Sequence, residues 1–383
     1  MENIVFAFPR LQKKNATYFD KFTDPLIELS ELKNNYLIFQ RPESGLHYKP
    51  RRNSAKEKYT DFIETTSKLA SLFLFPFVMM IRFKALMTIY RNGKRVFGLS
   101  TKDLFLMAYK ITIFTVQYII YRRLLKSLRP KNVFVVNRAL HYPVIVAAHK
   151  MNIASYELQH GVTHTWTVLY SGKYDPVIDP DYFLAFGQKW IGKQYGIPLD
   201  KMINIGWAYS DLIHIEMDKI DLYKNRVLVI SVPGISPQIV AATILLAKVY
   251  EKTTFDLRLH PQEQLSREEE NKIQQQTNVI LVDNTEESTQ TLMRYKYVLG
   301  VMSSVLFEAL SLQKNVRIIN FEPLKGEQYT GQTSKYFEKI NSVSDFQVFI
   351  NDDNPSSEKN GNTYYSQFDV KKFNELVRNE TSL

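Results

Sequence analysis

Two short stretches in the second half of the chain carry side chains that suit the binding of an anion. Arg258-Leu259-His260-Pro261 ends a short apolar run, and Ser303-Ser304 precedes an apolar segment that contains Glu308. A Ser pair at a helix start offers free backbone N–H groups and the positive end of the helix dipole, which suit a phosphate. His260 adds a donor for the same phosphate, and Glu308, one turn into the helix, can accept from ribose hydroxyls. Together these residues predict a site for a sugar nucleotide.

Each of these features also has a simpler explanation. A His-Pro pair is common in turns, and a Ser pair before a helix commonly serves as an N-cap. The combination is more informative, because each pair follows a short apolar run that is typical of a buried strand, at 255–259 and at 297–301. Open α/β sheets bind their ligands at the carboxyl ends of the strands, so both pairs are expected at one edge of a sheet.

The elements that must position these residues alternate regularly. Strands are predicted at 4–8, 36–40, 132–137, 153–158, 182–186, 202–205, 227–232, 255–259, 279–282, 297–301 and 316–320. Helices are predicted at 142–151, 189–195, 238–250, 267–276, 289–294, 305–312 and 370–377. This alternation indicates an α/β fold with parallel sheets that are covered on both faces.

The pattern divides into two α/β units. We interpret the polar segment 211–226 as a linker between an N-terminal domain, residues 1–210, and a C-terminal domain, residues 227–383, whose last helix could pack back on the N-terminal domain. Within the first unit, 49–58 is expected to be a charged loop. Long helices are predicted at 61–90, bent near Pro76, and at 101–128.

The positive charge of the chain is concentrated in this long-helix region. The whole chain has a formal charge of +10. Residues 1–130 hold 23 Lys and Arg against 10 Asp and Glu, whereas the remaining residues hold 26 Lys and Arg against 29 Asp and Glu. Aromatic and aliphatic residues alternate with the basic ones at 61–130, which favours attraction to anionic lipid headgroups. A core helix with a solvated basic end is the alternative. No recognition motif supports nucleic acid as a partner.

Composition excludes several classes of protein. The 383 residues include no cysteine, so disulfide frameworks, thiol nucleophiles and cysteine metal sites are excluded. A reducing cytoplasm fits this composition. The first ten residues lack the basic and apolar regions of a signal peptide. No apolar run is expected to reach the roughly 20 residues of a membrane-spanning helix. The best candidate run, 72–81, contains Pro76 and stops at Arg82.

Several motifs resemble those of GT-B glycosyltransferases, which have two doubly wound Rossmann-like domains facing a cleft. Arg258-Leu259-His260-Pro261 resembles the His-Pro motif of bacterial sialyltransferases, Kdo transferases and teichoic-acid glycerophosphotransferases. Ser303-Ser304 with Glu308 resembles their Ser/Thr motif and the following helix. The segment 157–161 resembles the Gln-His-Gly segment of capsule and teichoic-acid transferases. The segment 204–211 resembles the Gly-x-Pro-x-x-Asp segment that closes the N-terminal domain, with Ala208 in place of Pro.

This resemblance implies roles for particular residues on the donor side. The donor phosphate would be held by the His-Pro pair, His260 and Pro261, and by Ser303 and Ser304, with Arg258 as a further cation. Such groups stabilise the charge that develops on a leaving nucleotide without a metal ion. No Asp-x-Asp motif follows a strand; Asp179-Pro180-Asp181 precedes one and is interpreted as a turn.

The acceptor side is expected in the N-terminal domain. His160, at a strand end, is the first candidate for the general base, and Glu157 is the second. A purely structural role for His160 is the alternative. Gln159, His164 and Trp166 are expected to line the acceptor site, where an aromatic face can stack on a sugar.

The sequence therefore predicts a cytoplasmic transferase, peripheral to the inner face of the plasma membrane, that uses no metal or other cofactor. It would move a sugar from a nucleotide-activated donor, with CMP-sialic acid or CMP-Kdo favoured, to a hydroxyl of a bacterial surface glycan such as capsule or lipopolysaccharide. The alternatives are a CDP-polyol phosphotransferase of teichoic-acid type, a UDP-sugar transferase, and a non-catalytic glycan- or membrane-binding protein of the same fold.

Overall fold

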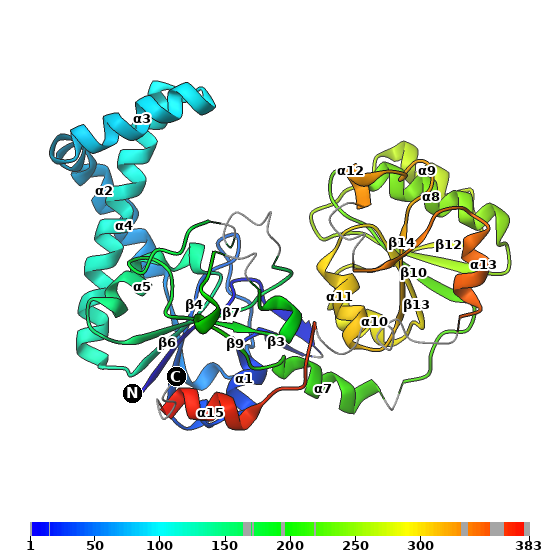
Figure 1. Ribbon diagram of the computed structural model, residues 1–383, viewed down its shortest axis with the longest axis horizontal. Coiled ribbons are helices and arrows are strands. Elements are labelled where there is room, and N and C mark those ends of the chain that lie inside the picture. The colour runs from blue at the N-terminus through cyan, green and yellow to red at the C-terminus, as the bar shows by residue number, and fades with distance from the viewer. Residues whose placement is uncertain are drawn as a thin grey trace.

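The computed structural model has two α/β domains side by side and a helical protrusion on the first (Figure 1). It describes residues 2–14, 16–163, 170, 172–192, 196–217, 220–330, 336–352 and 364–378. The helices and strands of the two domains are formed by consecutive stretches of chain, apart from the last helix. The two domains can therefore be described in turn.

The N-terminal domain is built on a parallel sheet of seven strands. Its strands are β1 (Asn3–Phe6), β4 (Tyr36–Gln40), β5 (Glu57–Tyr59), β6 (Asn132–Val136), β7 (Ala154–Leu158), β8 (Tyr182–Ala185) and β9 (Met202–Asn204). They pair in the order β5-β4-β1-β6-β7-β8-β9. A small antiparallel hairpin, β2 (Gln12–Lys14) with β3 (Thr17–Phe19), follows β1. The near-continuous apolar runs are explained by burial of both faces of the sheet.

The C-terminal domain has a parallel sheet of six strands. These are β10 (Arg226–Ile230), β11 (Thr254–Arg258), β12 (Val279–Val282), β13 (Tyr297–Gly300), β14 (Asn315–Ile319) and β15 (Glu338–Ile340). The order β12-β11-β10-β13-β14-β15 reverses between β10 and β13, as in a doubly wound fold. The predicted strands of this domain are all present, and only β15 was missed.

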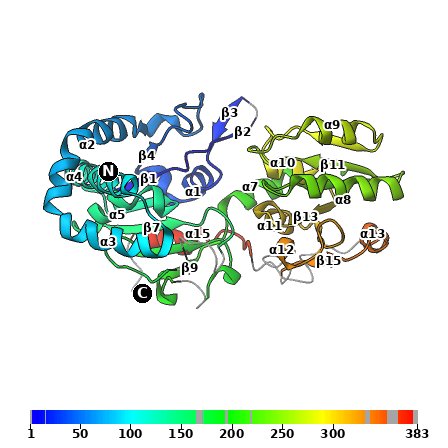
Figure 2. The same cartoon turned by 90° about the horizontal axis from the view of Figure 1, so that it is seen from above.

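Helices cover both faces of each sheet, as Figures 1 and 2 show. The helices of the N-terminal half are α1 (Asp24–Leu29), α2 (Asp61–Ile81), α3 (Phe83–Phe97), α4 (Thr101–Leu128), α5 (Tyr142–His149) and α7 (Ala208–Met217), of which α3 lies away from the sheet. In the C-terminal half they are α8 (Ser236–Val249), α9 (Arg267–Gln274), α10 (Ser288–Met293), α11 (Ser304–Ser311), α12 (Glu327–Thr330), α13 (Asp345–Ile350) and α15 (Val370–Arg378). Helices α8, α9 and α13 pack on one face of the second sheet, and α10 and α11 pack on the other.

Apart from the long helices, three predicted elements differ from the structure. The segment 49–58 was expected to be a charged loop, but it contains a 3-10 turn, Ser54–Lys56, and the start of the edge strand β5. The segment expected as a polar linker begins inside α7, because its apolar residues, such as Ile213, are buried. Residues 189–195 were expected to form a helix, but a 3-10 turn occupies Gln188–Trp190, and 193–195 lie outside the described residues.

Helices α2, α3 and α4 form the protrusion at the upper left of Figure 1. Pro76 lies inside α2, and the break falls instead at Arg82, between α2 and α3. The expectation that no segment is apolar enough to cross a membrane was also wrong. By length and composition α2 and α4 both reach that limit, and only 22% of each apolar window is buried. The prediction required an unbroken run of apolar residues, which was too strict, because isolated charged residues such as Lys68 and Lys110 interrupt helices that are otherwise apolar.

Helix α15 ends the chain on the N-terminal domain. Its side chains Phe373, Leu376 and Val377 join the core that contains Val5 and Phe134. The Nδ2 of Asn132 donates to the carbonyl of Val377 (2.8 Å), which fixes the end of the helix beside β6. The chain thus passes between the domains twice.

Gly206 lies where the returning chain crosses the end of β9. It has φ +75°, and a Cβ here would lie 2.0 Å from the carbonyl oxygen of Gln367 and 2.8 Å from Cα of Phe368. Backbone hydrogen bonds hold the two segments together, from Trp207 N to Ser366 O (3.0 Å) and from Asp369 N to Ile205 O (2.8 Å).

Replacing Gly206 by alanine is therefore expected to destabilise the fold. Left-handed backbone strain alone costs about 1–2 kcal/mol, and the clash adds to it, so we expect a loss of about 2 kcal/mol or more. Urea denaturation of the variant measures this loss. Gly161→Ala is the matched control, because a Cβ there meets nothing within 4 Å. Equal midpoints for the two variants would contradict the prediction.

Candidate active site

Among the described residues, the predicted histidines and the Ser pair lie at the carboxyl edges of the two sheets. In the second sheet, β11 runs into His260 and β13 runs into Ser303, on either side of the point where the strand order reverses. In the first sheet, β7 runs into His160, and the order reverses beside β1. Ligands of open parallel sheets bind at such reversal points, where neighbouring loops diverge.

His260 is held in a defined orientation at the end of β11. Its backbone N–H donates to Oε2 of Glu263 (2.5 Å), and Oε1 of Glu263 accepts from the hydroxyl of Ser231, which follows β10 (2.7 Å). The backbone N–H of Gln262 donates to Nδ1 of His260 (3.2 Å). Because Nδ1 accepts, the proton of the neutral ring is on Nε2, which can donate to a ligand. Pro261 is exposed beside it.

The Ser pair begins α11 as predicted. The hydroxyl of Ser303 is the N-cap and accepts from the backbone N–H of Val305 (3.2 Å), and Ser304 is the exposed first residue of the helix. The N-cap interpretation therefore describes Ser303. It does not conflict with anion binding, because a capped helix start keeps other free N–H groups and its dipole.

Arg258 is used inside its own domain. Its guanidinium donates to the carbonyls of Asp283 (3.1 Å) and Glu286 (2.5 Å) and to the hydroxyl of Thr291 (2.7 Å). Burial lowers its pKa, although nearby carboxylates oppose this. The side chain therefore fixes the loop before α10, and its role as a phosphate ligand stays a prediction.

Glu308 is bound by a lysine from the other domain. Lys21, just before α1, places Nζ 2.8 Å from Oε1 of Glu308 and 3.7 Å from Oε1 of Glu287. The hydroxyl of Ser288 donates to the other oxygen of Glu308 (3.0 Å). All three charged side chains are buried or nearly so. Burial lowers the pKa of Lys21, but the two carboxylates outweigh it and raise that pKa overall.

This ion cluster lies inside the apolar contact between the domains. Phe19, Trp207 and Tyr209 from the N-terminal domain share one core with Leu306 and Phe307 from α11. Tyr209 also donates to Oε2 of Glu287 (3.3 Å). The ribose-binding role of Glu308 stays a prediction, and in this structure its carboxylate instead joins the two domains.

His160 follows β7 in an aromatic setting. Its ring packs against Phe8 and Phe22, with centroid distances of 5.7 and 6.5 Å, and Nδ1 lies 3.4 Å from the hydroxyl of Tyr170. Burial lowers the pKa of His160, and the charge of Arg138 adds to this, while Glu157 opposes it. A neutral imidazole near pH 7 can accept a proton, as a general base must.

Glu157, the second candidate for the base, is fully buried and bound by an arginine. Oε2 accepts from Nε of Arg138 (2.5 Å), and Oε1 accepts from the backbone N–H of the same residue (2.9 Å). Nη1 of Arg138 donates to Asp179 (2.8 Å). These contacts give Glu157 a structural role under the loop that carries His160, and its role as the base stays a prediction.

The predicted acceptor residues fall partly outside the described chain. Gln159 is buried and ties its loop together, since Nε2 donates to the carbonyl of Gly161 (2.7 Å) and Oε1 accepts from Phe186 N (2.8 Å). His164 and Trp166 lie outside the described residues. The acceptor roles of these three residues stay predictions.

The loop after β1 acts on both histidines, by contact on His160 and by charge on His260, and sequence reasoning missed it. Phe8 contacts the ring of His160. Burial lowers the pKa of His260, and the positive charge of Arg10 lowers it further, while Glu263 opposes them. Nε of Arg10 lies 3.0 Å from Glu43 and is partly exposed. The signal in the sequence was a basic residue, Arg10, a few positions after the first strand.

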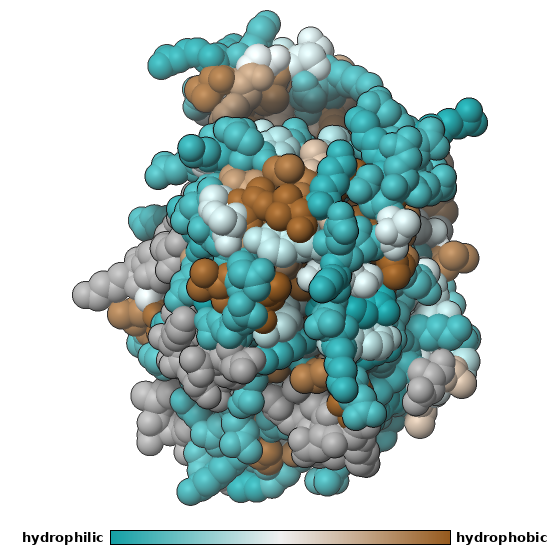
Figure 3. Space-filling model, turned by 90° about the vertical axis from the view of Figure 1, so that its right-hand side faces the viewer, coloured by the Kyte–Doolittle hydropathy of each residue, from teal (hydrophilic) through white to brown (hydrophobic). Residues whose placement is uncertain are grey.

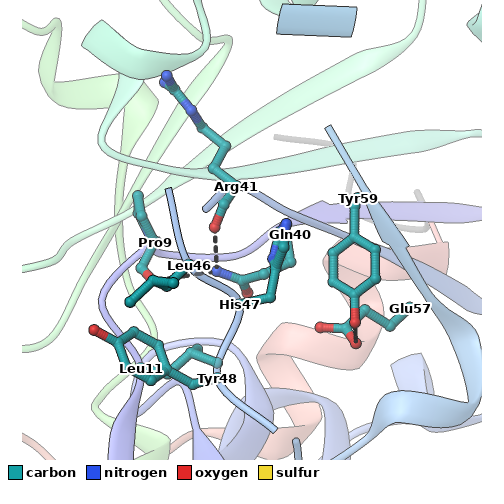
Figure 4. A pocket seen from close by; sticks show the side chains of 9 residues that line it. All are labelled: Pro9, Leu11, Gln40, Arg41, Leu46, His47, Tyr48, Glu57 and Tyr59. Carbon is teal, nitrogen blue, oxygen red and sulfur yellow. Dashed lines mark hydrogen bonds between the residues drawn. The ribbon is translucent and has the colours of Figure 1, made fainter. Parts of the chain in front are cut away.

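A shallow hollow lies further along the same edge of the first sheet (Figure 4). It is lined by Pro9, Leu11, Gln40, Arg41, Leu46, His47, Tyr48, Glu57 and Tyr59. His47 and Arg41 from this rim contact the first turn of α2, at Asp61 (2.8 Å) and Glu64 (2.7 Å). The base of the protrusion is thus attached to the loop that follows β4.

Comparison with solved structures shows the same architecture over nearly the whole chain. UDP-GlcNAc 2-epimerase from Neisseria meningitidis, bound to UDP-GlcNAc, is 15% identical, with both chains fully covered and a TM-score of 0.57. The lipopolysaccharide outer core galactosyltransferase WaaB in its apo form is 10% identical, again with both chains fully covered, and its TM-score is 0.52. A variant of the wall teichoic acid polymerase TagF is 11% identical over 99% of this chain and 89% of that chain, with a TM-score of 0.50.

At these identities the likeness shows the fold alone. The chain has the GT-B fold, as predicted, with two Rossmann-like domains built on parallel sheets. Searches of its sequence against family models and against curated proteins find no match.

Proposed function

We propose that the chain is a glycosyltransferase that moves a sugar from a CMP-activated donor to a hydroxyl of a bacterial surface glycan. The observation that carries this proposal is the placement of two neutral histidines, His160 and His260, at the ligand-binding edges of the two sheets. His160 contacts the loop after β1 through Phe8, and the charge of Arg10 in the same loop acts on His260. The preference for cytidine rests on the resemblance of the His-Pro and Ser-Ser motifs.

In the proposed reaction the acceptor hydroxyl gives its proton to Nε2 of His160. Nδ1 already faces the hydroxyl of Tyr170, which orients the ring. The acceptor oxygen then bonds to the anomeric carbon, and the bond from that carbon to the donor phosphate breaks. Charge that develops on the leaving nucleotide is stabilised by the Nε2–H of His260 and by the start of α11 at Ser303 and Ser304.

Metal ions have no role in this proposal, because the histidine and the helix start supply the donors that face the phosphate. Arg10, whose charge acts on His260, is a cation of the other domain that can add to them. We also propose that the enzyme works in the cytoplasm at the inner face of an anionic membrane, where lipid-linked glycan acceptors are found. The uneven charge of the chain supports this location.

A thermal-shift panel with CMP, CDP, UDP, GDP and buffer tests the donor. A ligand that binds only the folded chain raises its melting temperature. We expect CMP to give the largest shift, with a large part of it lost in His260→Ala. The matched control is His149→Ala, whose ring contacts Ser155 and Asp181 at the opposite edge of the sheet.

The other outcomes of the panel separate the alternatives. A larger shift with CDP would favour a polyol phosphotransferase, and a larger shift with UDP would favour a UDP-sugar transferase. Either result would overturn the CMP donor and leave the fold unaffected. No shift with any nucleotide would favour a binding protein that has lost turnover.

A further inference from the structure

The protrusion formed by α2, α3 and α4 differs from a soluble helical bundle, in which the large apolar side chains are buried between the helices and the polar ones are exposed. Small or hydroxylated residues are buried in the middle of α2 and α4, at Ser67 and Ser71 on one helix and Ala108 and Thr112 on the other. Larger buried residues lie at the base, at Ile63, Tyr121 and Leu125, and against α3, at Leu104. The hydroxyl of Thr112 donates to the carbonyl of Ala108 (2.8 Å), and that of Ser67 donates to Ile63 O, so both are satisfied within their own helices. Small residues at a helix contact are typical of helices packed in lipid.

The large apolar side chains of the protrusion point away from this contact. On α2, the exposed fractions of Phe73, Phe77 and Ile81 are 76%, 60% and 74%. The helices hold sixteen of the 27 large apolar side chains that are exposed in the described chain: Phe62, Leu69, Leu72, Phe73, Leu74, Phe77, Met80, Ile81, Phe83, Ile89, Val96, Phe97, Phe105, Leu106, Ile111 and Ile119. A continuous exposed apolar surface of this kind marks a contact with another apolar phase.

The far end of the molecule gives the contrast. Figure 3 views the C-terminal domain end-on and shows apolar side chains as patches within a mainly hydrophilic surface. The exposed large apolar residues in the described part of this domain are Leu245, Val249, Ile280, Leu281 and Val348. The apolar surface is therefore concentrated on the protrusion.

The charge of the protrusion favours an anionic bilayer over a second protein copy. Between Arg82 and Lys131 there are twelve basic residues and one acid, Asp103, which caps α4 together with Ser100. On α3, Lys84, Arg91, Lys94 and Arg95 are exposed on one side, whereas Leu86 and Tyr90 pack against α4. Basic and apolar faces on one helix are typical of helices that lie in a membrane interface. Two copies would instead bring like charges together.

The distribution of charge along α2 limits how deeply the protrusion can enter. Its uncharged stretch runs from Leu69 to Ile81, between Lys68 and Arg82. Thirteen helical residues rise about 20 Å, less than the roughly 30 Å of a bilayer's hydrocarbon core. The hydroxyl of Tyr109 on α4 donates to the carbonyl of Lys68 (3.2 Å), and Lys110, next to Tyr109, is exposed. Both helices therefore carry a lysine at the same level of the protrusion.

We infer that the protrusion lies along one leaflet of an anionic membrane, and that α3 and the exposed faces of the distal halves of α2 and α4 enter this leaflet without crossing the bilayer. The basic residues of α3 lie among the headgroups, and the exposed apolar side chains of α2 lie among the acyl chains. Because α2 begins at contacts with His47 and Arg41, insertion holds the carboxyl edge of the first sheet at a fixed height above the lipid. This inference does not depend on the reaction that the chain performs.

Vesicle flotation of the full chain tests the inserted surface. Vesicles of phosphatidylcholine with one quarter phosphatidylglycerol are compared with vesicles of phosphatidylcholine alone, at low and high salt. We expect the variant Phe73→Ser, Phe77→Ser, Ile81→Ser to bind anionic vesicles at least tenfold more weakly. Since these side chains are exposed, the variant should melt like the native chain. The control Leu245→Ser, Val249→Ser, Val348→Ser removes apolar residues from the other domain and should bind normally.

The contribution of charge is measured in the same experiment with the variant Arg91→Gln, Lys94→Gln, Arg95→Gln. This variant should lose its preference for anionic over neutral vesicles, and high salt should have the same effect on the native chain. Native chain that stays unbound to anionic vesicles at low salt would overturn the inference. So would equal binding by the apolar variant, or a dimer of the native chain that this variant abolishes.

The depth of insertion has its own test, because the chain contains no cysteine. Asn92→Cys places one thiol on an exposed position of α3. When protein is added to preformed vesicles, a membrane-impermeant maleimide outside them should label this thiol fully. Protection that is released only by detergent would place α3 on the far side and would overturn insertion into a single leaflet.

Discussion

Replacing His160 by alanine should slow sugar transfer by about 10²–10⁴-fold while donor binding is retained, because removal of a general base affects the chemical step. The donor for this measurement is the one whose nucleotide gives the largest thermal shift. His160 contacts Phe8, Phe22 and Tyr170 in the N-terminal domain, whereas the predicted phosphate ligands belong to the other domain. Binding and turnover should therefore respond separately.

The pH dependence of the native enzyme distinguishes a base from a structural histidine. Burial lowers the pKa of His160 below its ordinary value of 6.5. The neutral ring is the active form, so the rate should be constant around pH 7 and should fall only as the pH drops through this lowered pKa. His149→Ala should keep both the rate and the profile. A normal rate in His160→Ala would remove this residue from the reaction and leave its structural role.

The second large effect is expected in stability, from Lys21→Met. This change leaves the buried carboxylates of Glu287 and Glu308 without their cation. Breaking a buried ion pair from one side typically costs about 3–5 kcal/mol, because the remaining charge has lost its water and its partner. The loss should appear in chemical denaturation of the whole chain. Lys13→Met, at an exposed position on β2, is the control.

The loss should also grow with pH. Burial raises the pKa of Glu287, and the neighbouring Glu308 raises it further, whereas Lys21 lowers it. Without Lys21 the carboxyl of Glu287 should bind a proton more tightly in the folded chain than in the unfolded chain. Stability is then retained at low pH and lost as the pH rises through the raised folded-state pKa. We expect a larger difference between variant and native chain at pH 8 than at pH 5.

A double variant separates the ion pair from simple loss of packing. Removing both partners, in Lys21→Met with Glu308→Met, should cost less than removing Lys21 alone, since fewer buried charges remain unpaired. A double variant that is less stable than the single one would contradict this account of the cluster.

The repeating parts of the fold were predictable from the sequence, whereas the pairing of distant side chains was not. Strands such as β11 and β13 and the start of α11 follow from short apolar runs and capping residues, whose signals are local. Lys21 and Glu308 are 287 positions apart, so no spacing could reveal their contact. The same is true of Arg258, whose partners are carbonyls of another loop.

The protrusion shows a different limit of sequence reasoning. The apolar residues of α2 were visible, but their exposure was not, because an apolar helix in a core and one facing lipid share the same composition. The buried serines, Ser67 and Ser71, could have been noticed. They recur at a spacing of four and follow Ile63 by the same interval, which places one narrow stripe of mostly small residues on a helix with a wide apolar surface.

The position of α15 has a consequence for how the chain folds as it is made. The N-terminal domain completes its core with Phe373, Leu376 and Val377, which are synthesised after the entire C-terminal sheet. The second domain, contiguous from β10 to α13, is therefore the first whose core is complete on the ribosome. Domains usually fold in the order of synthesis. Here the first half must wait, with one face of its sheet only partly covered by α1, until α15 is released.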